Sequence, residues 1–349
     1  MEATLDCDVL VVGAGAAGLR AAIEASAAGA RTAVACKSLL GKAGTVLERG
    51  GIACASKEAA ERVAELESWG ALLERAPQSL VAHRDDRTGQ EVLRALQHEV
   101  LRRGIEVHME CAIHRLLLDA GRVVGAFGIR RPSGGFVHFR SRAVILATGG
   151  CGRAWRDDAS PADATGDGHA LALDAGARLA NKDSIFGVRV DPESAASGIP
   201  GLYAAGDVAA GDGLSDALVS GRRAGLHAAR YSRTEHGRNL IDVGRLSAIG
   251  RQLLAPLERK GGENPYAVLF ALQDARTLEE IRILKTRVAN ASAPGPRAYN
   301  PAWQLALELR ALLVVSEKLI ERNTSWLARK PRSASGAATR AAASSKNTG

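Results

Sequence analysis

The sequence is poor in aromatic residues, since Phe, Trp and Tyr together make up only 4 % of its 349 residues. The interior must therefore be packed by alanine, leucine, valine and glycine. A chain of this length buries a sizeable core, and its length suggests two domains or one domain with an appendage.

Cysteines are few and scattered. The five of them stand without a CxxC pair, at Cys7, Cys36, Cys54, Cys111 and Cys151. This spacing indicates neither a disulfide framework nor a zinc or iron-sulfur site, and it fits a reducing compartment.

Long hydrophobic runs are also missing. No apolar run approaches the roughly 18 residues that span a bilayer, and residues 1–8 lack the core of a signal peptide. We therefore expect a cytoplasmic protein that inserts no segment into the membrane and contacts its inner face only through a partner.

The formal net charge is +8, and part of it comes from the C-terminal tail. After Ala328 the chain has no acidic residue and carries Arg329, Lys330, Arg332, Arg340 and Lys346. The basic balance therefore gives little argument for a nucleic-acid partner.

A glycine-rich turn near the N-terminus is the most informative stretch. The apolar run Val9–Val12 is followed by Gly13, Gly15 and Gly18 in GxGxxG spacing and then by an alanine-rich helical run. Such a strand, turn and helix bind a dinucleotide pyrophosphate at the helix N-terminus. The alternative is a glycine turn in an ordinary strand-to-helix unit.

The second strand of this unit is predicted at residues 31–36. Nucleotide-binding folds usually place an acidic residue at its end for the ribose hydroxyls, but here the position holds Cys36 and Lys37. The ribose contact must come from elsewhere. In residues 38–55, Gly50 and Gly51 would let the backbone pass close to a flat ring, although a surface loop is the alternative.

Periodicity predicts the remaining elements of the first two thirds of the chain. Helices are expected at residues 19–28, 57–75, 90–103, 164–180 and 214–231. A small antiparallel meander is expected at residues 105–108, 112–118, 122–129 and 135–140. Buried strands at 143–150 and 202–207 return to the first sheet, which predicts an α/β fold of the two-dinucleotide-binding, Rossmann-like type.

Three histidines fall on the meander strands: His108, His114 and His138. Because no carboxylate or cysteine pattern accompanies them, we interpret all three as solvated strand residues rather than metal ligands.

The C-terminal third is predicted to be a helical appendage, with helices at residues 245–258, 265–273, 277–289 and 301–322. Asn300 followed by Pro301 is a helix-start signal. The last helix is expected to bury Trp303, Leu307, Leu313 and Val314 or their neighbours. We predict domains at residues 1–237 and 238–328, and a disordered tail at 329–349.

Several segments, taken in order, resemble the flavoprotein subunit of succinate dehydrogenase and fumarate reductase, and L-aspartate oxidase is a similar relative. The resemblance runs from Asp8 to about Arg322. The segments are VVGAGAAGLRAA, KSLLGKAGTVLERGGIA, DRTG, AVILATGG, ATGDGHALALDAGA, PGLYAAGD, LSDALVSGRRAG, GENPY and YNPAWQLALELR. The resemblance implies an FAD-binding domain over residues 1–237 and oxidoreductase chemistry in electron transport and the tricarboxylic acid cycle. Hydride moves between a dicarboxylate and flavin N5 while an acid or base handles the proton.

Carried over by position, the resemblance implies a set of FAD contacts. Gly13, Gly15, Ala16 and Gly18 would hold the pyrophosphate, Lys37 and Ser38 the adenosine side, and Gly50 and Gly51 would face the flavin. Ala147, Thr148 and Gly149 would flank the dinucleotide, and Asp207 would meet the ribityl or phosphate region, with Leu214 beside it. Asp167 would lie near the flavin, with a helix cap as its alternative role.

The sequence departs from the family's pattern mainly at positions that act on the substrate, and less at positions that bind the cofactor. The position of the histidine that carries the covalent flavin bond is Gly44, so the FAD would be noncovalent. A short connection at residues 181–191 replaces the capping domain, which carries the family's proton-donating arginine. The glycine-rich stretch with a substrate arginine is shortened to residues 209–213. No residue can therefore be assigned as the catalytic proton donor.

Three hypotheses remain open. The first is an FAD-dependent oxidoreductase of the succinate dehydrogenase and fumarate reductase type, whose partner is an iron-sulfur subunit. The second is a noncatalytic FAD-binding or scaffold protein that keeps the docking surface for such a partner. The third is a decayed gene product that folds poorly because loss of the cap exposes apolar surface.

Overall fold

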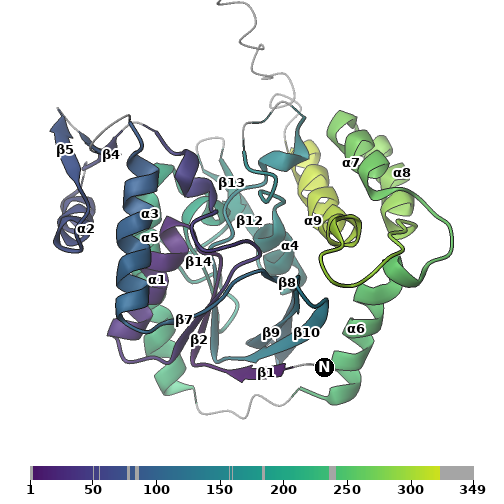
Figure 1. Cartoon of the computed structure of the whole chain (residues 1–349), viewed down its shortest axis with the longest axis horizontal. Helices are drawn as coiled ribbons and strands as arrows, with labels where there is room; N and C mark the ends of the chain where they lie inside the picture. The colour runs from purple at the N-terminus through teal and green to yellow at the C-terminus, as the bar shows by residue number, and fades with distance from the viewer. Residues whose placement is uncertain are drawn as a thin grey trace, which may run out of the picture.

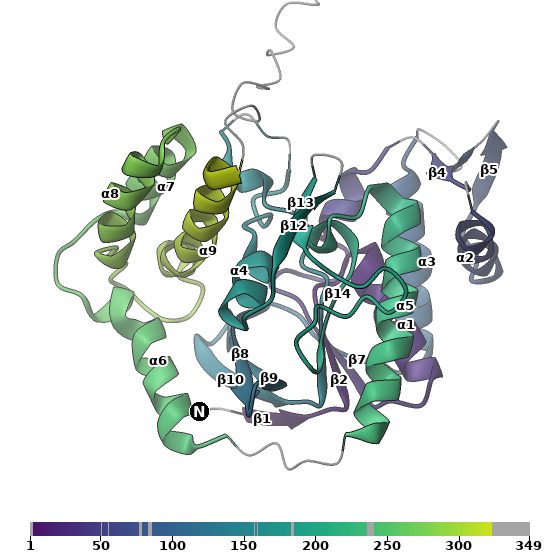
Figure 2. The same cartoon turned by 180° about the vertical axis from the view of Figure 1, so that it is seen from behind.

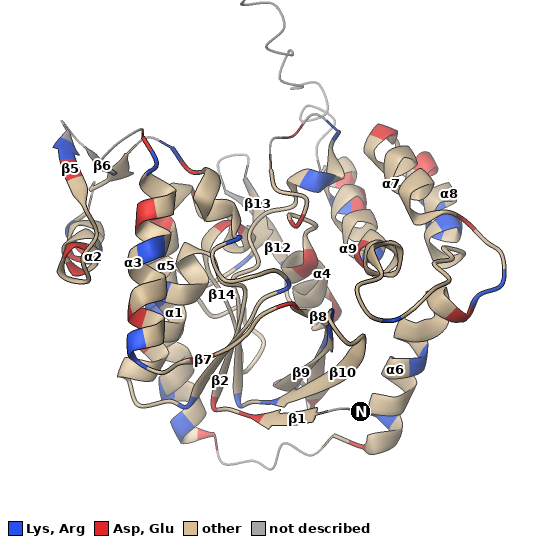
Figure 3. Cartoon of the chain, viewed as in Figure 1, with Lys and Arg blue, Asp and Glu red and all other residues tan. Residues whose placement is uncertain are grey.

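The computed structural model describes residues 3–49, 51–54, 56–76, 79–82, 86–156, 158, 160–182, 185–235 and 241–322. An α/β body occupies most of it, and the C-terminal helices lie along one side (Figures 1 and 2). Basic and acidic residues are interspersed along helices such as α3 and α9 (Figure 3).

A five-stranded parallel sheet forms the centre of the body. Its order is β14-β11-β2-β3-β7, and every neighbouring pair is parallel. The strands are β2 (Val9–Val12), β3 (Thr32–Ala35), β7 (Glu106–His108), β11 (Ala143–Leu146) and β14 (Leu202–Ala204). Their mostly apolar residues suit a sheet covered on both faces. The order reverses beside β2, so the loops after β2 and β11 diverge and leave a crevice for a ligand.

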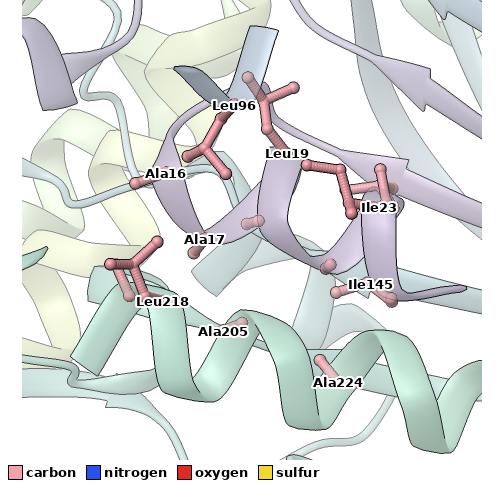
Figure 4. Packing of buried hydrophobic residues seen from close by; sticks show 14 of the residues in the cluster. Ala16, Ala17, Leu19, Ile23, Leu96, Ile145, Ala205, Leu218 and Ala224 are labelled. Atoms are coloured by element: carbon pink, nitrogen blue, oxygen red, sulfur yellow. The ribbon is translucent and has the colours of Figure 1, made fainter. Parts of the chain in front are cut away.

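Three helices cover one face of this sheet: α1 (Ala16–Ala27), α3 (Thr88–Arg102) and α5 (Gly213–Thr234). Small residues bring α1 and α5 close together, with Ala17 and Ala224 between them (Figure 4). A Cβ at Gly221 or Gly225 of α5 would overlap the backbone carbonyl of Ala17 or Ala21. This packing fits a chain with few aromatic residues.

A second sheet of order β1-β10-β9-β8 covers the other face. Its strands are β1 (Ala3–Asp6), β8 (Cys111–Asp119), β9 (Arg122–Arg130) and β10 (Gly135–Arg140). The antiparallel meander is confirmed for β8, β9 and β10. The predicted first strand of the meander is wrong, because β7 pairs with β3 in the parallel sheet, and β1 joins β10 instead.

Two predicted helices end earlier than expected. Helix α2 (Lys57–Ser68) stops before Gly70, whose φ is +88°, and the small sheet of β4 (Ile52–Ala53), β5 (Leu73–Ala76) and β6 (Ser79–Ala82) lies beside it. Helix α4 (Asp167–Asp174) stops before Gly176, whose φ is +91°. Glycine adopts this left-handed conformation at little cost and commonly terminates helices.

The chain after α4 forms a short hairpin. Strands β12 (Leu179–Lys182) and β13 (Ile185–Val188) pair in antiparallel register. Residues 181–182 and 185–188 of the predicted connection at 181–191 therefore belong to a regular two-stranded element.

Four helices complete the described chain: α6 (Val243–Glu258), α7 (Pro265–Asp274), α8 (Leu278–Ala289) and α9 (Pro301–Arg322). The predicted start of α9 is confirmed, since the Asn300 side chain accepts a hydrogen bond from the Trp303 N–H at 3.0 Å. Trp303 and Leu313 are buried as expected, whereas Leu307 and Val314 are half-buried.

The helical region packs on the second sheet of the body. Trp303 and Leu309 of α9 share one apolar cluster with Phe127 and Ile129 of β9. The domain boundary near residue 237 stays a prediction, and residues 329–349 lie outside the described part. Among the described residues, no helix is both long enough and apolar enough to cross a membrane.

Candidate functional site

A cleft of about 440 Å³ opens at the carboxyl ends of β2, β3 and β11. Its walls come from the turn between β2 and α1, the loop after β3 with η1 (Gly44–Leu47), and the loop after β11. The segment before α4 and the start of η3 (Gly206–Ala209) close the remaining sides. Segments far apart in the sequence thus meet where a doubly wound sheet binds ligands.

The glycine turn has no room for side chains. Gly13 has a φ of +115°, and a Cβ there would lie 2.1 Å from the Ala147 carbonyl oxygen. A Cβ at Gly18 would lie 2.1 Å from the Gly13 carbonyl oxygen. The first glycine therefore lets β2 turn against β11, and the third lets α1 pack on that turn, as the spacing predicts.

The N-terminus of α1 points its backbone donors at the cleft. Gly15 occupies the N-cap without a capping side chain, and the first turn of α1 contains no acidic residue. The Ala16 N–H donates to Thr45 Oγ1 at 3.0 Å. The remaining N–H groups of this turn and the helix dipole together favour an anionic ligand such as a pyrophosphate.

Lys37 lines the cleft, but its ammonium group faces protein acceptors. Its Nζ lies 2.6 Å from Thr165 Oγ1, 2.8 Å from Asp167 Oδ2 and 3.1 Å from Glu308 Oε1. A lysine has three N–H donors, so these acceptors use all of them. Lys37 can therefore offer a ligand its backbone and aliphatic stem rather than its charge.

The charges of this cluster stabilise one another. Burial opposes the ammonium form of Lys37, but Asp167 and Glu308 outweigh it and raise the Lys37 pKa. Burial likewise opposes ionisation of Asp167, yet Lys37 keeps the Asp167 pKa below its usual value. For Glu308, burial dominates and raises the pKa although Lys37 acts against it.

At the other end of the cleft, Asp207 lies across from Gly149, where a Cβ would be 3.9 Å from Asp207 Oδ2. The Asp207 side chain is exposed to the open cleft, but the surrounding walls desolvate the carboxylate and raise its pKa. Glu48 also lines the cleft, and partial desolvation together with Asp207 raises the Glu48 pKa. This end therefore suits the hydroxyl and amide groups of a neutral ligand portion better than a phosphate.

Ten of the predicted site residues line the cleft. They are Gly13, Gly15, Ala16, Lys37, Ser38, Ala147, Thr148, Gly149, Asp167 and Asp207. Asp167 is also the first residue of α4, but its carboxylate binds Lys37 and Thr165 rather than capping the helix.

Of the other four predicted residues, the three that the structure describes do not line it. Gly18 acts through packing, Leu214 is buried at the start of α5, and Gly51 is exposed outside the cleft. Gly50 lies outside the described residues.

Sequence reasoning missed several residues of the site. Thr45, Glu48, Cys111 and Ile113 line the cleft, and Glu308 reaches it through Lys37. Thr45 directly follows Gly44, which the family resemblance identifies as the position of the flavin-linked histidine. Its nearness to the glycine turn could therefore have been inferred. Glu308 is 271 residues from Lys37 in sequence and has no local signal.

The interpretation of the three histidines as solvated is wrong. His138 is 4 % exposed and the side chain of His108 is 9 % exposed, and His108 packs edge-on against Phe139 at 5.1 Å between ring centroids. His114 is largely buried as well, and its Nε2 has no hydrogen-bond partner among the described residues. Burial lowers the His114 pKa to about 4, so this ring is neutral.

These features fit FAD. The helix N-terminus suits the pyrophosphate, the glycine turn leaves its backbone open, and the cleft extends from there toward both Lys37 and Asp207. The lining residues, all in the described part of the chain, include Lys37 and Lys42 as cations but no arginine or histidine.

Comparison with known proteins agrees with this geometry. The family described as "FAD binding domain" matches residues 8–87 and 58–186. A fumarate reductase (CoM/CoB) chain of Methanothermobacter marburgensis is 33 % identical over 233 residues, which cover 53 % of this chain and 43 % of that protein. L-aspartate oxidase of Streptomyces coelicolor is 29 % identical over 326 residues, which cover 79 % of this chain and 54 % of that protein.

A solved structure resembles most of the fold. Mycobacterium smegmatis Sdh1 in complex with UQ1 superposes with a TM-score of 0.82 and 28 % identity, covering 91 % of this chain and 86 % of that chain. The chain spans about half the length of the curated relatives it matches. It belongs to the FAD binding domain family and resembles the flavoprotein subunits of succinate dehydrogenase and fumarate reductase.

Proposed function

We propose that the cleft binds FAD noncovalently. The observation that carries this proposal is the N-terminus of α1, which opens onto the cleft without a capping side chain or an acid in its first turn. Gly44 lines the same cleft and offers no side chain for a covalent flavin bond. Burial raises the thiol pKa of Cys36 to about 11 and that of Cys111 to about 12, so neither is a nucleophile at neutral pH.

Each part of the cleft has a role in this proposal. The N–H groups at the start of α1 hold the pyrophosphate, Ser38 lies on the adenosine side, and Gly149 and Asp207 lie on the flavin side. The resemblance implied that Asp167 lies near the flavin, but because its carboxylate pairs with Lys37 we assign it to the adenosine side. Bound FAD supplies a hydride acceptor and donor at flavin N5. Gly13 and Gly18 act on the cofactor indirectly, by fixing the turn.

We further propose that the chain interconverts succinate and fumarate, and that an iron-sulfur subunit is both its electron partner and its contact with the membrane. Support comes from relatives whose names are those of a fumarate reductase and of the flavoprotein subunit of succinate dehydrogenase. A dicarboxylate needs cationic donors above the flavin. Lys42, whose Nζ has no ion pair within the described part, is the cation of the lining that remains free for this.

A noncatalytic FAD-binding protein is the second candidate, and one observation favours it. The described lining of the cleft contains no arginine or histidine, and the short β12–β13 hairpin lies in the segment where the family resemblance implies a capping domain. Without such a group, proton transfer to the substrate carbon lacks a placed acid.

Two measurements test these proposals in sequence. The purified chain reconstituted with FAD should show a bound-flavin absorbance band, and acid precipitation should leave the flavin in the supernatant. Flavin in the pellet would refute noncovalent binding, and absence of any bound flavin would refute the site.

The second measurement is turnover of succinate with an artificial electron acceptor, and of fumarate with a reduced dye. The oxidoreductase proposal requires turnover above that of free FAD and a loss of it in Lys42→Met. Turnover at the free-flavin level with FAD bound would favour the noncatalytic protein.

A further inference from the structure

Lys37 lines the cleft and joins three parts of the chain: its own loop after β3, the start of α4, and α9. It lies on the loop after β3, and its acceptors are Thr165 in the segment before α4, Asp167 at the first turn of α4, and Glu308 in the middle of α9. The side chain of Lys37 is 16 % exposed and that of Glu308 is 9 % exposed. The contact with Glu308 is therefore a largely buried ion pair between the nucleotide-binding body and the C-terminal helical region.

Other charged groups complete the surroundings of Glu308. Its second carboxylate oxygen, Oε2, lies 3.6 Å from Arg153 Nη1 of η2 (Gly152–Ala154). With Asp167, the cluster thus contains two cations and two carboxylates. Asp163 acts on Lys37 at longer range, and the neutral His114 of β8 faces Asp167. Charges buried in balance are tolerated, whereas removal of one partner leaves an uncompensated charge.

Glu308 differs from its partners in its relation to the cleft. Lys37 and Asp167 line the cleft, but Glu308 does not, so it acts on the cleft through Lys37. A second ion pair, between Arg310 of α9 and Asp174 at the end of α4, holds the same stretch of α9 against α4 at 2.6 Å. These polar contacts therefore join α9, which also packs on the body through apolar residues, to two residues of the cleft.

We propose that Glu308 is a positioning residue that couples FAD binding in the cleft to the docking of α9 on the body. This inference rests on the proposed FAD site. FAD that packs against Lys37 and Asp167 fixes the two groups that hold Glu308. In turn, α9 in its docked position holds those groups in the geometry that FAD needs. Linkage requires that FAD stabilise the docked position of α9 by the same free energy by which docked α9 strengthens FAD binding.

The first test uses the whole chain without substitution. Hydrogen exchange is followed by mass spectrometry with and without FAD, and α8 serves as the internal reference because it packs against α7 and α9 and contributes no described residue to the cluster. We expect FAD to slow exchange in α9 around Glu308 by about tenfold more than in α8, which lies within the usual range of coupling between sites. Equal protection of α8 and α9 would overturn the inference.

The second test compares FAD affinities by quenching of flavin fluorescence. Glu308→Gln should weaken FAD binding by about tenfold, and Glu308→Asp, which keeps the charge, should recover most of the loss. The control is Glu317→Gln, since Glu317 is on α9 but pairs with Lys285 of α8, away from the cleft. This control should bind FAD like the unaltered chain.

A double-mutant comparison separates positioning from a merely structural role. In a Lys37→Met background, Glu308→Gln should change FAD affinity by less than about twofold, because the residue through which Glu308 acts is gone. A tenfold loss in both backgrounds would overturn the proposal. If the unaltered chain bound no FAD, the proposed site itself would be refuted; if it bound FAD and Glu308→Gln matched Glu317→Gln, only the coupling would be.

Discussion

Gly13 provides the sharpest test of how the cleft is built, because a matched control exists in the same unit. Gly13 and Gly29 both have a positive φ, +115° and +86°. They differ in their surroundings: a Cβ at Gly13 would lie 2.1 Å from the Ala147 carbonyl oxygen, whereas a Cβ at Gly29 would meet nothing within 4 Å. Substitution by alanine therefore adds backbone strain at both positions and steric overlap at Gly13 alone.

The expected magnitudes follow from these two contributions. A left-handed backbone at a non-glycine residue costs roughly 1–2 kcal/mol, so Gly29→Ala should lower the free energy of unfolding by about that amount. Overlap with a packed neighbour adds about 1–3 kcal/mol. Gly13→Ala should therefore lose about 2–5 kcal/mol, because β11 must move away from β2.

Urea unfolding followed by circular dichroism measures both variants, and flavin fluorescence measures FAD binding. Gly13→Ala should bind FAD much more weakly than Gly29→Ala, since the displaced strand carries Ala147 at the cleft wall. Equal loss of stability in the two variants would refute the close approach of β2 and β11, and unchanged FAD affinity in Gly13→Ala would refute the placement of the cofactor.

Three further predictions concern the cleft and the core. Gly150 lines the cleft and a Cβ there would meet nothing within 4 Å, so Gly150→Val should leave stability within about 0.5 kcal/mol and weaken FAD binding in a titration. Trp303 is fully buried and its Nε1–H donates to the Leu253 carbonyl at 2.8 Å, so Trp303→Phe should cost about 1–3 kcal/mol in urea unfolding, and no loss would show that the carbonyl finds another donor. His169 is fully buried and burial lowers its pKa from 6.5 to about 4. The unfolded chain therefore takes up this proton first, and stability should fall by roughly 3 kcal/mol as pH drops from 6.5 to 4. His169→Gln should reduce that slope, and an identical pH profile would contradict the assignment.

Elements with local signals could be predicted from the sequence. The start of α9 depends on Asn300 and Pro301, which are adjacent, and the cap forms as expected. The glycine turn has an equally local signal in the spacing of Gly13, Gly15 and Gly18, although the strand that Gly13 lies against comes much later in the chain. The apolar runs of β2 and β11 predict their burial because parallel central strands are covered on both faces.

Features that depend on distant partners could not be predicted in this way. Residues 106–108 suit a meander strand as well as a parallel one, and pairing with β3 decides between them. The burial of His138 depends on how the two sheets stack, which its neighbours in sequence do not indicate. The same holds for the site, where the pairing of Lys37 with Glu308 exists only after α9 has docked.

The β12–β13 hairpin also has a consequence for protein engineering. Lys182 and Ile185 are partners in its ladder, so the chain leaves and re-enters the body at one point. A domain inserted between two such neighbouring ends leaves the register of the body unchanged, and the entropy of closing the longer loop grows only logarithmically with its length. The hairpin is thus a suitable insertion site: a further domain inserted between Lys182 and Ile185 would need no redesign of the nucleotide-binding core.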